Sequence, residues 1–97
     1  MNTSICAVIR DRSVIQFNYD GGPRTVEPHC HGTSTAGNEV LRGYQTSGFS
    51  QSGNPVGWKL FEVAKIHSLH PAGARFSNTR PGYNPDDRGM SMIHCHV

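Results

Sequence analysis

The sequence lacks the features of a membrane or secreted protein. Its 97 residues contain no apolar run of about 18 residues, the length that a membrane-spanning helix needs. The N-terminus has no basic segment followed by a long apolar stretch, as a signal peptide would. There is also no internal repeat and no low-complexity segment. We therefore expect one cytoplasmic domain, residues 1–97, without a membrane segment.

Cysteine is scarce, and its spacing fits no common motif. Cys6, Cys30 and Cys95 are odd in number and contain no C-x-x-C pair. Free thiols in a reducing cytoplasm are therefore expected rather than a disulfide framework. Motifs of catalysis are missing too, since no nucleophile elbow, Walker loop or spaced pair of carboxylates occurs. We expect neither enzymatic activity nor a cofactor.

Charge and lysine are sparse, whereas turn-forming residues are common. Charged residues make up 16% and apolar residues 35%, beside 11 Gly and 6 Pro, which favours a small turn-rich β fold over a helical bundle. The net charge is only +2, and of nine basic residues all but Lys59 and Lys65 are arginine. Arginine is preferred where two-point contact with carboxylate or phosphate matters. Ordinary surface charge remains an alternative explanation.

Hydrophobic periodicity predicts one helix followed by short strands. Ile5, Val8 and Ile9 fall on one face of a helix over residues 3–12, which Thr3 or Ser4 would cap. Strands are expected at 13–19, 24–31, 39–46, within 57–69 and at 90–97. Gly43 marks a bulge, 47–55 is a mobile loop, and 70–89 is an irregular arm. Four or five strands with Gly- and Pro-rich turns indicate a small β-barrel.

The order of these segments resembles the WYL domains of bacteria. The resemblance lies in Val14–Tyr19 (VIQFNY), Arg24–Pro28 (RTVEP), Glu39–Tyr44 (EVLRGY) and Phe61–Leu69 (FEVAKIHSL), and it covers residues 5–70. Val40-Leu41 stand where the family has Tyr-Leu, and Lys65 stands where it usually has arginine. Residues 70–97 add the arm and a terminal strand.

The resemblance implies a mainly β fold, an Sm-like or SH3-like barrel with a short N-terminal helix. Such domains are ligand-sensing modules of transcription regulation, usually attached to a DNA-binding helix-turn-helix. Their basic patch is thought to take nucleic acid or nucleotide-like ligands. This chain would then be a standalone WYL-like domain that binds an anionic ligand.

Five side chains are the candidate ligand-binding residues. They are Arg24, Arg42, Lys65, Tyr44 and Trp58. The three basic ones lie on different predicted strands and would converge on one face, where charge-assisted hydrogen bonds hold phosphate. The aromatic ones would offer stacking surfaces for bases. Alternatively, each of the three basic side chains is a separate surface charge, or Arg24 pairs with Glu27 or Glu62.

Two His-Cys-His triplets suggest a less expected site. They are His29-Cys30-His31 and His94-Cys95-His96. Positions i and i+2 of a strand share a face, so four imidazoles from neighbouring strands could surround a zinc ion, or the cysteines could join them. The spacing matches no common zinc motif. In the alternative, the histidines face solvent and both cysteines pack in the core.

The second function considered is a protein-interaction module. Small barrels pair through edge strands, which requires no anion site. The segment 80–87 is rich in Pro, Gly and Asn and would cover one barrel mouth with Tyr83 as an anchor, or contact a partner subunit. A homodimer is one form that such contact would take.

Overall fold

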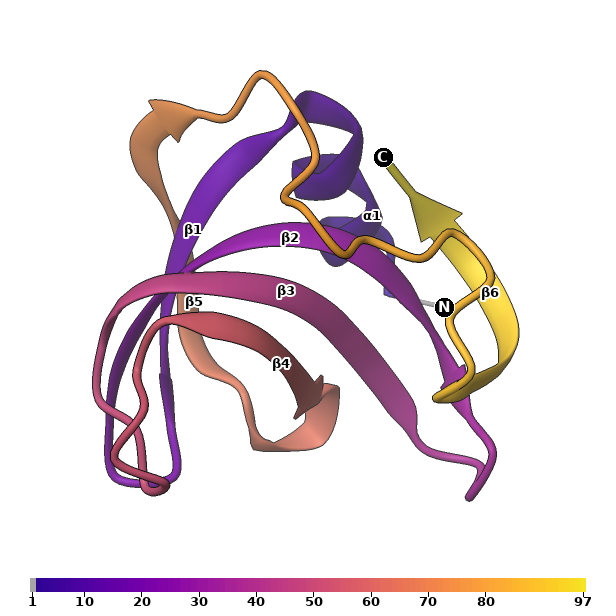
Figure 1. The fold of residues 1–97 in the computed structure, drawn as a ribbon, viewed down its shortest axis with the longest axis horizontal. Coiled ribbons are helices and arrows are strands. Elements are labelled where there is room, and N and C mark those ends of the chain that lie inside the picture. Colours follow the sequence, from indigo (N-terminus) through magenta and orange to yellow (C-terminus); the bar gives the residue numbers. More distant parts are fainter. Residues whose placement is uncertain (1) are drawn as a thin grey trace.

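Six strands and one short helix carry most of the chain (Figure 1). The computed structural model describes residues 2–97. In chain order its elements are α1 (Thr3–Asp11), β1 (Ser13–Tyr19), β2 (Gly22–Ser34), β3 (Glu39–Gly48), β4 (Gly57–Glu62), the 3₁₀ turn η1 (Val63–Lys65), β5 (His67–Arg75) and β6 (Met90–His96). The expectation of a mainly β fold with a short N-terminal helix is confirmed.

Helix α1 forms where the apolar periodicity predicts it, but its cap differs. Asn2, rather than Thr3 or Ser4, is the N-cap, and its side chain accepts a hydrogen bond from the Ile5 amide at 3.0 Å. Ile5 and Ile9 are buried where the helix packs on β1, β2 and β6. No helix within residues 2–97 has the length and apolar character that crossing a membrane requires.

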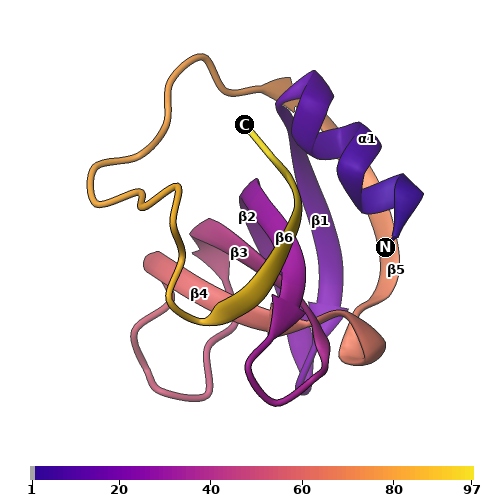
Figure 2. The ribbon, with the colours of Figure 1, turned by 90° about the vertical axis from the view of Figure 1, so that its right-hand side faces the viewer.

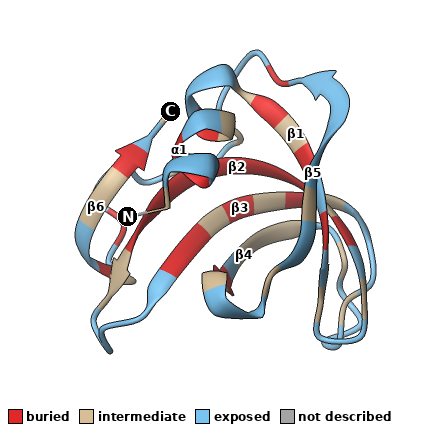
Figure 3. Cartoon of the chain, turned by 180° about the vertical axis from the view of Figure 1, so that it is seen from behind, coloured by how far each residue is buried: buried red, intermediate tan, exposed pale blue. Residues whose placement is uncertain are grey.

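The strands form one antiparallel sheet that does not close into a barrel. Its order is β4-β3-β2-β1-β5, and β6 pairs with β2. Among residues 2–97, the outer strands β4 and β5 pair only with β3 and β1, so the closure expected of a barrel is not found. The register of β5 on β1 shifts twice, and nearly all of β5 is exposed (Figure 3).

Strand β2 is long enough to serve two parts of the sheet. Its first half pairs with β1 and its second half with β6, while β3 runs along its other edge. The register on β3 slips between Pro28 and Cys30, opposite Gly43. A Cβ on Gly43 would lie 2.4 Å from a Val26 methyl group, so the strands meet closely beside this bulge.

The later part of the chain contains more regular structure than its composition predicts. Strand β5 continues to Arg75, so residues 70–75 of the segment predicted to be irregular are a strand. Residues 76–89 have no helix or strand and cross in front of β2 before β6 begins (Figure 1). We call residues 76–89 the arm.

The core lies between α1 and the concave face of the sheet. Phe17, Phe61 and Leu41 are among its buried side chains. Cys6 and Cys95 also lie there, and they form a disulfide, so the expectation of free thiols is wrong for this pair. The helix packs on β6, which brings the two cysteines together although 89 residues separate them. Cys30 is free and buried, and burial raises the pKa of its thiol to about 11.

Candidate ligand-binding site

The arm crosses the convex face of the sheet, where contacts with three strands, β2, β3 and β4, attach it. It leaves the end of β5, bows outward and returns to β6 (Figure 2). Gly, Pro and Asn recur along it, which suits a chain of tight turns without regular hydrogen bonding. One such turn is fixed by the Asn84 side chain, which accepts a hydrogen bond from the Asp86 amide at 2.9 Å.

The first attachment is an ion pair between Arg80 and Glu27 of β2. Arg80 donates from Nε and Nη2 to the two carboxylate oxygens, at 2.7 and 3.0 Å. The pairing raises the pKa of Arg80. The guanidinium also lies over the Tyr44 ring, 4.7 Å from its centre. This two-point geometry fixes both the position and the orientation of the arm.

The second attachment is an aromatic cluster around His29 of β2. The ring centres of Trp58, Phe76 and Tyr83 lie 4.8, 5.0 and 5.4 Å from that of His29. Trp58 of β4 donates its indole N–H to the Pro81 carbonyl at 2.9 Å. Gly82 has a φ of +90°, and a Cβ there would lie 3.1 Å from the Trp58 nitrogen. A glycine at this position therefore lets the arm lie close to the indole.

The hydrogen bonds of His29 require its neutral form. Nδ1 lies 2.8 Å from the Glu27 carbonyl, which can only accept, so this nitrogen carries the proton. Nε2 lies 3.3 Å from the Arg80 amide, which can only donate, so this nitrogen is bare. The ring is fully buried, and burial lowers the pKa of His29.

The third attachment joins Arg42 of β3 to Asp87. Arg42 donates from Nε and Nη2 to the carboxylate at 2.7 and 3.1 Å. The Gly89 amide donates to the same carboxylate at 2.9 Å. These bonds, led by that from Arg42, lower the pKa of Asp87 although its burial opposes the shift. Asp87 is thereby held as a buried anion beside a partly exposed cation.

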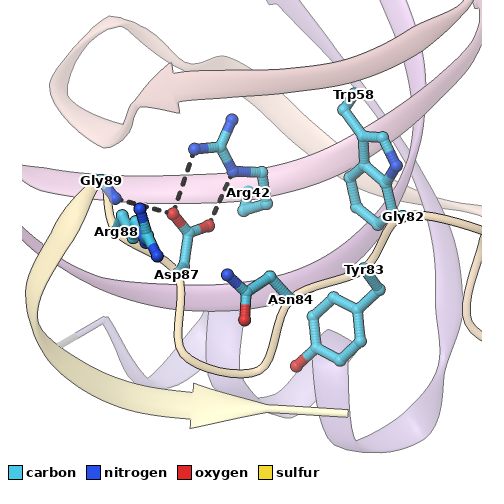
Figure 4. Close-up of a pocket in the computed structure, with 8 residues that line it drawn as sticks. All are labelled: Arg42, Trp58, Gly82, Tyr83, Asn84, Asp87, Arg88 and Gly89. Carbon is cyan, nitrogen blue, oxygen red and sulfur yellow. Dashed lines mark hydrogen bonds and ion pairs between the residues drawn. The ribbon is translucent and has the colours of Figure 1, made fainter.

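A pocket of about 350 Å³ lies between the second and third attachments (Figure 4). Its lining includes Arg42, Trp58, Tyr83, Asn84, Asp87 and Arg88. The aromatic rings lie at one side and the charged groups at the other, with Asn84 between them. Arg88 is exposed and forms no ion pair with any residue of 2–97. The pocket thus offers a flat apolar wall and an unpaired cation.

Tyr83 contributes a second unusual group near this pocket. Its hydroxyl is buried and has no hydrogen-bond partner within residues 2–97. Burial raises the pKa of this phenol, and the neighbouring Cys30 and Asp87 raise it further. The hydroxyl is therefore a neutral donor that is left without an acceptor beneath the arm.

Arg24 lies away from this pocket, on the concave face. It is 5% exposed, donates to Gln45 Oε1 at 3.2 Å and the Tyr19 carbonyl at 3.1 Å, and pairs with neither Glu27 nor Glu62. The rings of Tyr19, Phe49 and Phe61 surround its guanidinium. Its position inside the sheet excludes it from a surface shared with Arg42.

Lys65 also lies apart from the other basic residues of the predicted binding site. It belongs to η1, is exposed and pairs with Glu62 at 3.3 Å. Arg24, Arg42 and Lys65 therefore do not converge, because they occupy the concave face, the convex face and the turn after β4. Of the predicted residues, Arg42 and Trp58 share the pocket, and Tyr44 lies beside Trp58, with ring centres 5.5 Å apart.

The four histidines of the triplets do not surround a common point. The bulge after Pro28 turns His29 toward the arm, whereas His31 lies on the other side, where it accepts from the Asn2 amide at 3.0 Å. His94 contacts His31 and Thr33, and His96 is exposed. Within residues 2–97 no three His, Cys, Asp or Glu side chains gather as metal ligands would. The rule that i and i+2 share a face fails here because a bulge intervenes.

Sequence reasoning missed the arm residues that complete the pocket. Asn84, Asp87 and Arg88 lie in the segment interpreted as the cover of a barrel mouth or as a partner contact. Across residues 2–97 the sheet does not close into a barrel, so the arm covers its convex face instead, where Tyr83 packs on His29. The sequence feature that could have indicated these residues is the segment Arg80 to Asp87, which is rich in turn-forming residues and ends in two acidic residues. Its partners Glu27 and Arg42 are 53 and 45 residues away, a pairing that no local pattern encodes.

Comparisons of the chain with protein-family models, with curated proteins and with solved structures found no match.

Proposed function

We propose that this domain is a regulatory binding module for a small anionic ligand with a planar ring, of the nucleotide class. The observation that carries the proposal is the pocket in which the unpaired Arg88 lies opposite the indole of Trp58. Aromatic faces stack on any nucleobase, and arginine is suited to phosphate. The proposal is of a binding module and not of an enzyme.

The charges in the pocket favour an anion over a cation. Asp87 lines the pocket, but it is only 8% exposed and its carboxylate already accepts hydrogen bonds from Arg42 and Gly89, which offset its charge. Arg42 has a further nitrogen, Nη1, that bonds to no residue of 2–97. An incoming phosphate would therefore meet Arg88 and the free side of Arg42.

The size of the pocket favours one nucleotide unit over a nucleic-acid surface. Its volume of about 350 Å³ is at the lower end of the range for small-molecule sites, roughly 300–1,000 Å³. A free nucleotide and a single nucleotide of a longer strand present the same ring and phosphate. Separate titrations with a mononucleotide and with a single-stranded oligonucleotide distinguish these sources.

We further propose that the domain is an SH3-like, WYL-like module. The strand order β4-β3-β2-β1-β5, with a 3₁₀ turn joining the two outer strands, supports an SH3-like arrangement that is open at one side. The resemblance to WYL domains supports a ligand-sensing role. Arg42 is the residue that the resemblance and the pocket have in common.

The test is a titration of the protein with adenosine monophosphate, with adenosine and with inorganic phosphate. Because Trp58 is the sole tryptophan of the chain, its fluorescence reports on the aromatic wall. We expect Arg88→Gln to weaken binding of the monophosphate by about five- to tenfold, as expected for loss of one charge-assisted hydrogen bond. Adenosine should be affected little.

Arg10→Gln is the matched control. Arg10 is exposed on α1 and, like Arg88, forms no ion pair with any residue of 2–97. Both variants remove one positive charge, so a general electrostatic effect would appear in both. Equal loss in the two variants, or no binding of any of the three probes at low salt, would contradict the proposal.

One observation favours the second function, a protein-interaction module. Strand β5 is almost entirely exposed and pairs with β1 alone among the described strands, which leaves its other edge open to a partner strand. Salt dependence separates the two functions, because phosphate binding weakens steeply as salt rises. Sedimentation at several protein concentrations would show whether the partner is a second copy of the chain.

A further inference from the structure

The geometry around His29 points to a pH-dependent control of the pocket: we propose that the neutral imidazole holds the arm closed and that its protonation releases the arm and dismantles the pocket wall. This inference rests on the proposed function only for its effect on ligand binding. The opening of the arm itself is a property of the protein without ligand.

The first step is the hydrogen bonding of the ring. Both nitrogens of a protonated imidazole carry hydrogen. Nε2–H would then face the Arg80 amide, which also donates, in place of the 3.3 Å contact in which Nε2 accepts. Protonation therefore turns an attachment of the arm into a repulsion between two donors.

The second step is the set of charges that face His29 from each element packed on it. Arg80 of the arm and Arg12 at the end of α1 are cations that oppose a charge on the ring. Within residues 2–97, Glu27 of β2 is the anion that acts on the ring, and Arg80 already engages both of its carboxylate oxygens. Trp58 and Phe76 bring no charge, and the Tyr83 phenol is neutral.

The third step links the ring to the pocket. His29 contacts both Trp58 and Tyr83, which form the aromatic wall, and Trp58 bonds in turn to Pro81 of the arm. Movement of the arm away from His29 separates Tyr83 from Trp58. Protonation of the buried His29 ring therefore disrupts the aromatic wall, although His29 itself does not contact the ligand.

The sign of the effect follows from linkage. Burial lowers the pKa of His29 in the closed arm, whereas an exposed ring in the open arm has a pKa of about 6.5. The closed state is thus fully favoured above pH 6.5 and loses population as the pH falls below that value. If His29 stays neutral in the closed state, the ratio of closed to open falls by up to about tenfold between pH 7.5 and 5.5.

The experiment follows the indole N–H of Trp58 by ¹⁵N NMR between pH 7.5 and 5.5, without ligand. We expect its protection against solvent exchange, taken relative to the intrinsic indole exchange rate at each pH, to fall up to about tenfold at the lower pH in wild type. His29→Phe keeps a ring in the cluster but cannot be charged, so its indole exchange should not depend on this titration. His96→Phe, a change at an exposed histidine, should retain the wild-type response.

Direct titration of the His29 ring in the wild-type protein is the second measurement. It should show that the pKa of the ring lies below its ordinary value, and that the ring is protonated over the same pH range in which the indole loses protection against exchange. This result supports the inference even if His29→Phe fails to fold. An indole that does not respond in wild type, or that responds equally in folded His29→Phe, overturns it.

Adenosine monophosphate titrations at the two pH values separate the inference from the proposed function. If the indole responds through His29 but the monophosphate binds at neither pH, the control of the arm stands and the proposed ligand class fails. If the monophosphate binds and the indole exchange is insensitive to His29, the ligand class stands and the control fails.

Discussion

Cys6 of α1 and Cys95 of β6 form a disulfide that joins positions 89 residues apart, so nearly the whole chain lies within one closed loop. Helix α1 is only nine residues long and depends on packing for its stability. The disulfide fixes it to the last strand, where both sulfurs are buried with the core. The N- and C-terminal elements therefore form one unit with the sheet.

Removal of this disulfide should lower stability substantially. The loop-entropy model gives about 4–5 kcal/mol for a loop of this length, which lies at the upper end of the roughly 2–5 kcal/mol that removal of a native disulfide from a small domain costs. Urea unfolding of wild type, with and without a reductant that opens the bond, measures the difference. Cys6→Ala/Cys95→Ala should match the reduced protein, and reductant should not change it further. A reduced protein as stable as the oxidised one would contradict this prediction.

Asp87→Asn should destabilise the protein at neutral pH and have little effect in acid. The folded state lowers the pKa of Asp87 below its ordinary value of 3.8, so its contribution to stability is present above that value and disappears as the pH falls through the lowered pKa. Loss of the charge-assisted bonds to Arg42 costs roughly 1–2 kcal/mol near pH 7.

Urea unfolding at pH 7 and near the acid limit of stability measures the effect of Asp87→Asn. The control is Asp86→Asn, the neighbouring carboxylate, which is exposed and forms no ion pair within residues 2–97. Asp86→Asn should change stability by less than about 0.5 kcal/mol at either pH. An equal loss in both variants would show that general charge, and not the pair with Arg42, stabilises the arm.

The local part of this fold was predictable because its signals lie within a few residues of one another. Ile5, Val8 and Ile9 define the helix, and the alternation through Ile15 and Phe17 defines β1. Closure into a barrel was not predictable in this way. It depends on whether β5 meets β4, two strands whose pairing no local pattern encodes, and among the described strands they do not pair.

The site was predicted only in part, for two physical reasons. The bulge after Pro28 broke the two-residue period and sent His29 and His31 to opposite faces. The strand alternation also predicts that Arg24 faces the core, because it lies two residues before the buried Val26. The charge of Arg24 had suggested an exposed position instead. Arginine has a long apolar stem and can occupy a position that faces the core.

Gly82→Ala should loosen the arm beyond the ordinary penalty of a left-handed residue. A φ of +90° costs an alanine about 1–2 kcal/mol, and the new methyl group would also lie 3.1 Å from the Trp58 nitrogen. Gly73→Ala is the matched control, since Gly73 has a φ of +85° but nothing within 4 Å of a Cβ. Solvent exchange of the Trp58 indole N–H should increase in Gly82→Ala alone. Equal exchange in both variants would mean that Gly82 is needed only for its backbone conformation.

Arg24→Met tests whether the buried arginine has any part in ligand binding. Methionine retains a flexible apolar stem among Tyr19, Phe49 and Phe61 but removes a guanidinium whose Nε has no partner within residues 2–97. The variant loses the two hydrogen bonds that Arg24 donates to neutral acceptors, but it no longer has to bury a charge that has no ionic partner within residues 2–97. Because these two effects oppose each other, we expect the free energy of unfolding to change by less than about 1.5 kcal/mol. Because Arg24 is on the concave face, affinity for adenosine monophosphate should match that of wild type, whereas Arg88→Gln weakens it. Weaker binding in a folded, equally stable Arg24→Met protein would move the anion site from the arm to the interior of the sheet.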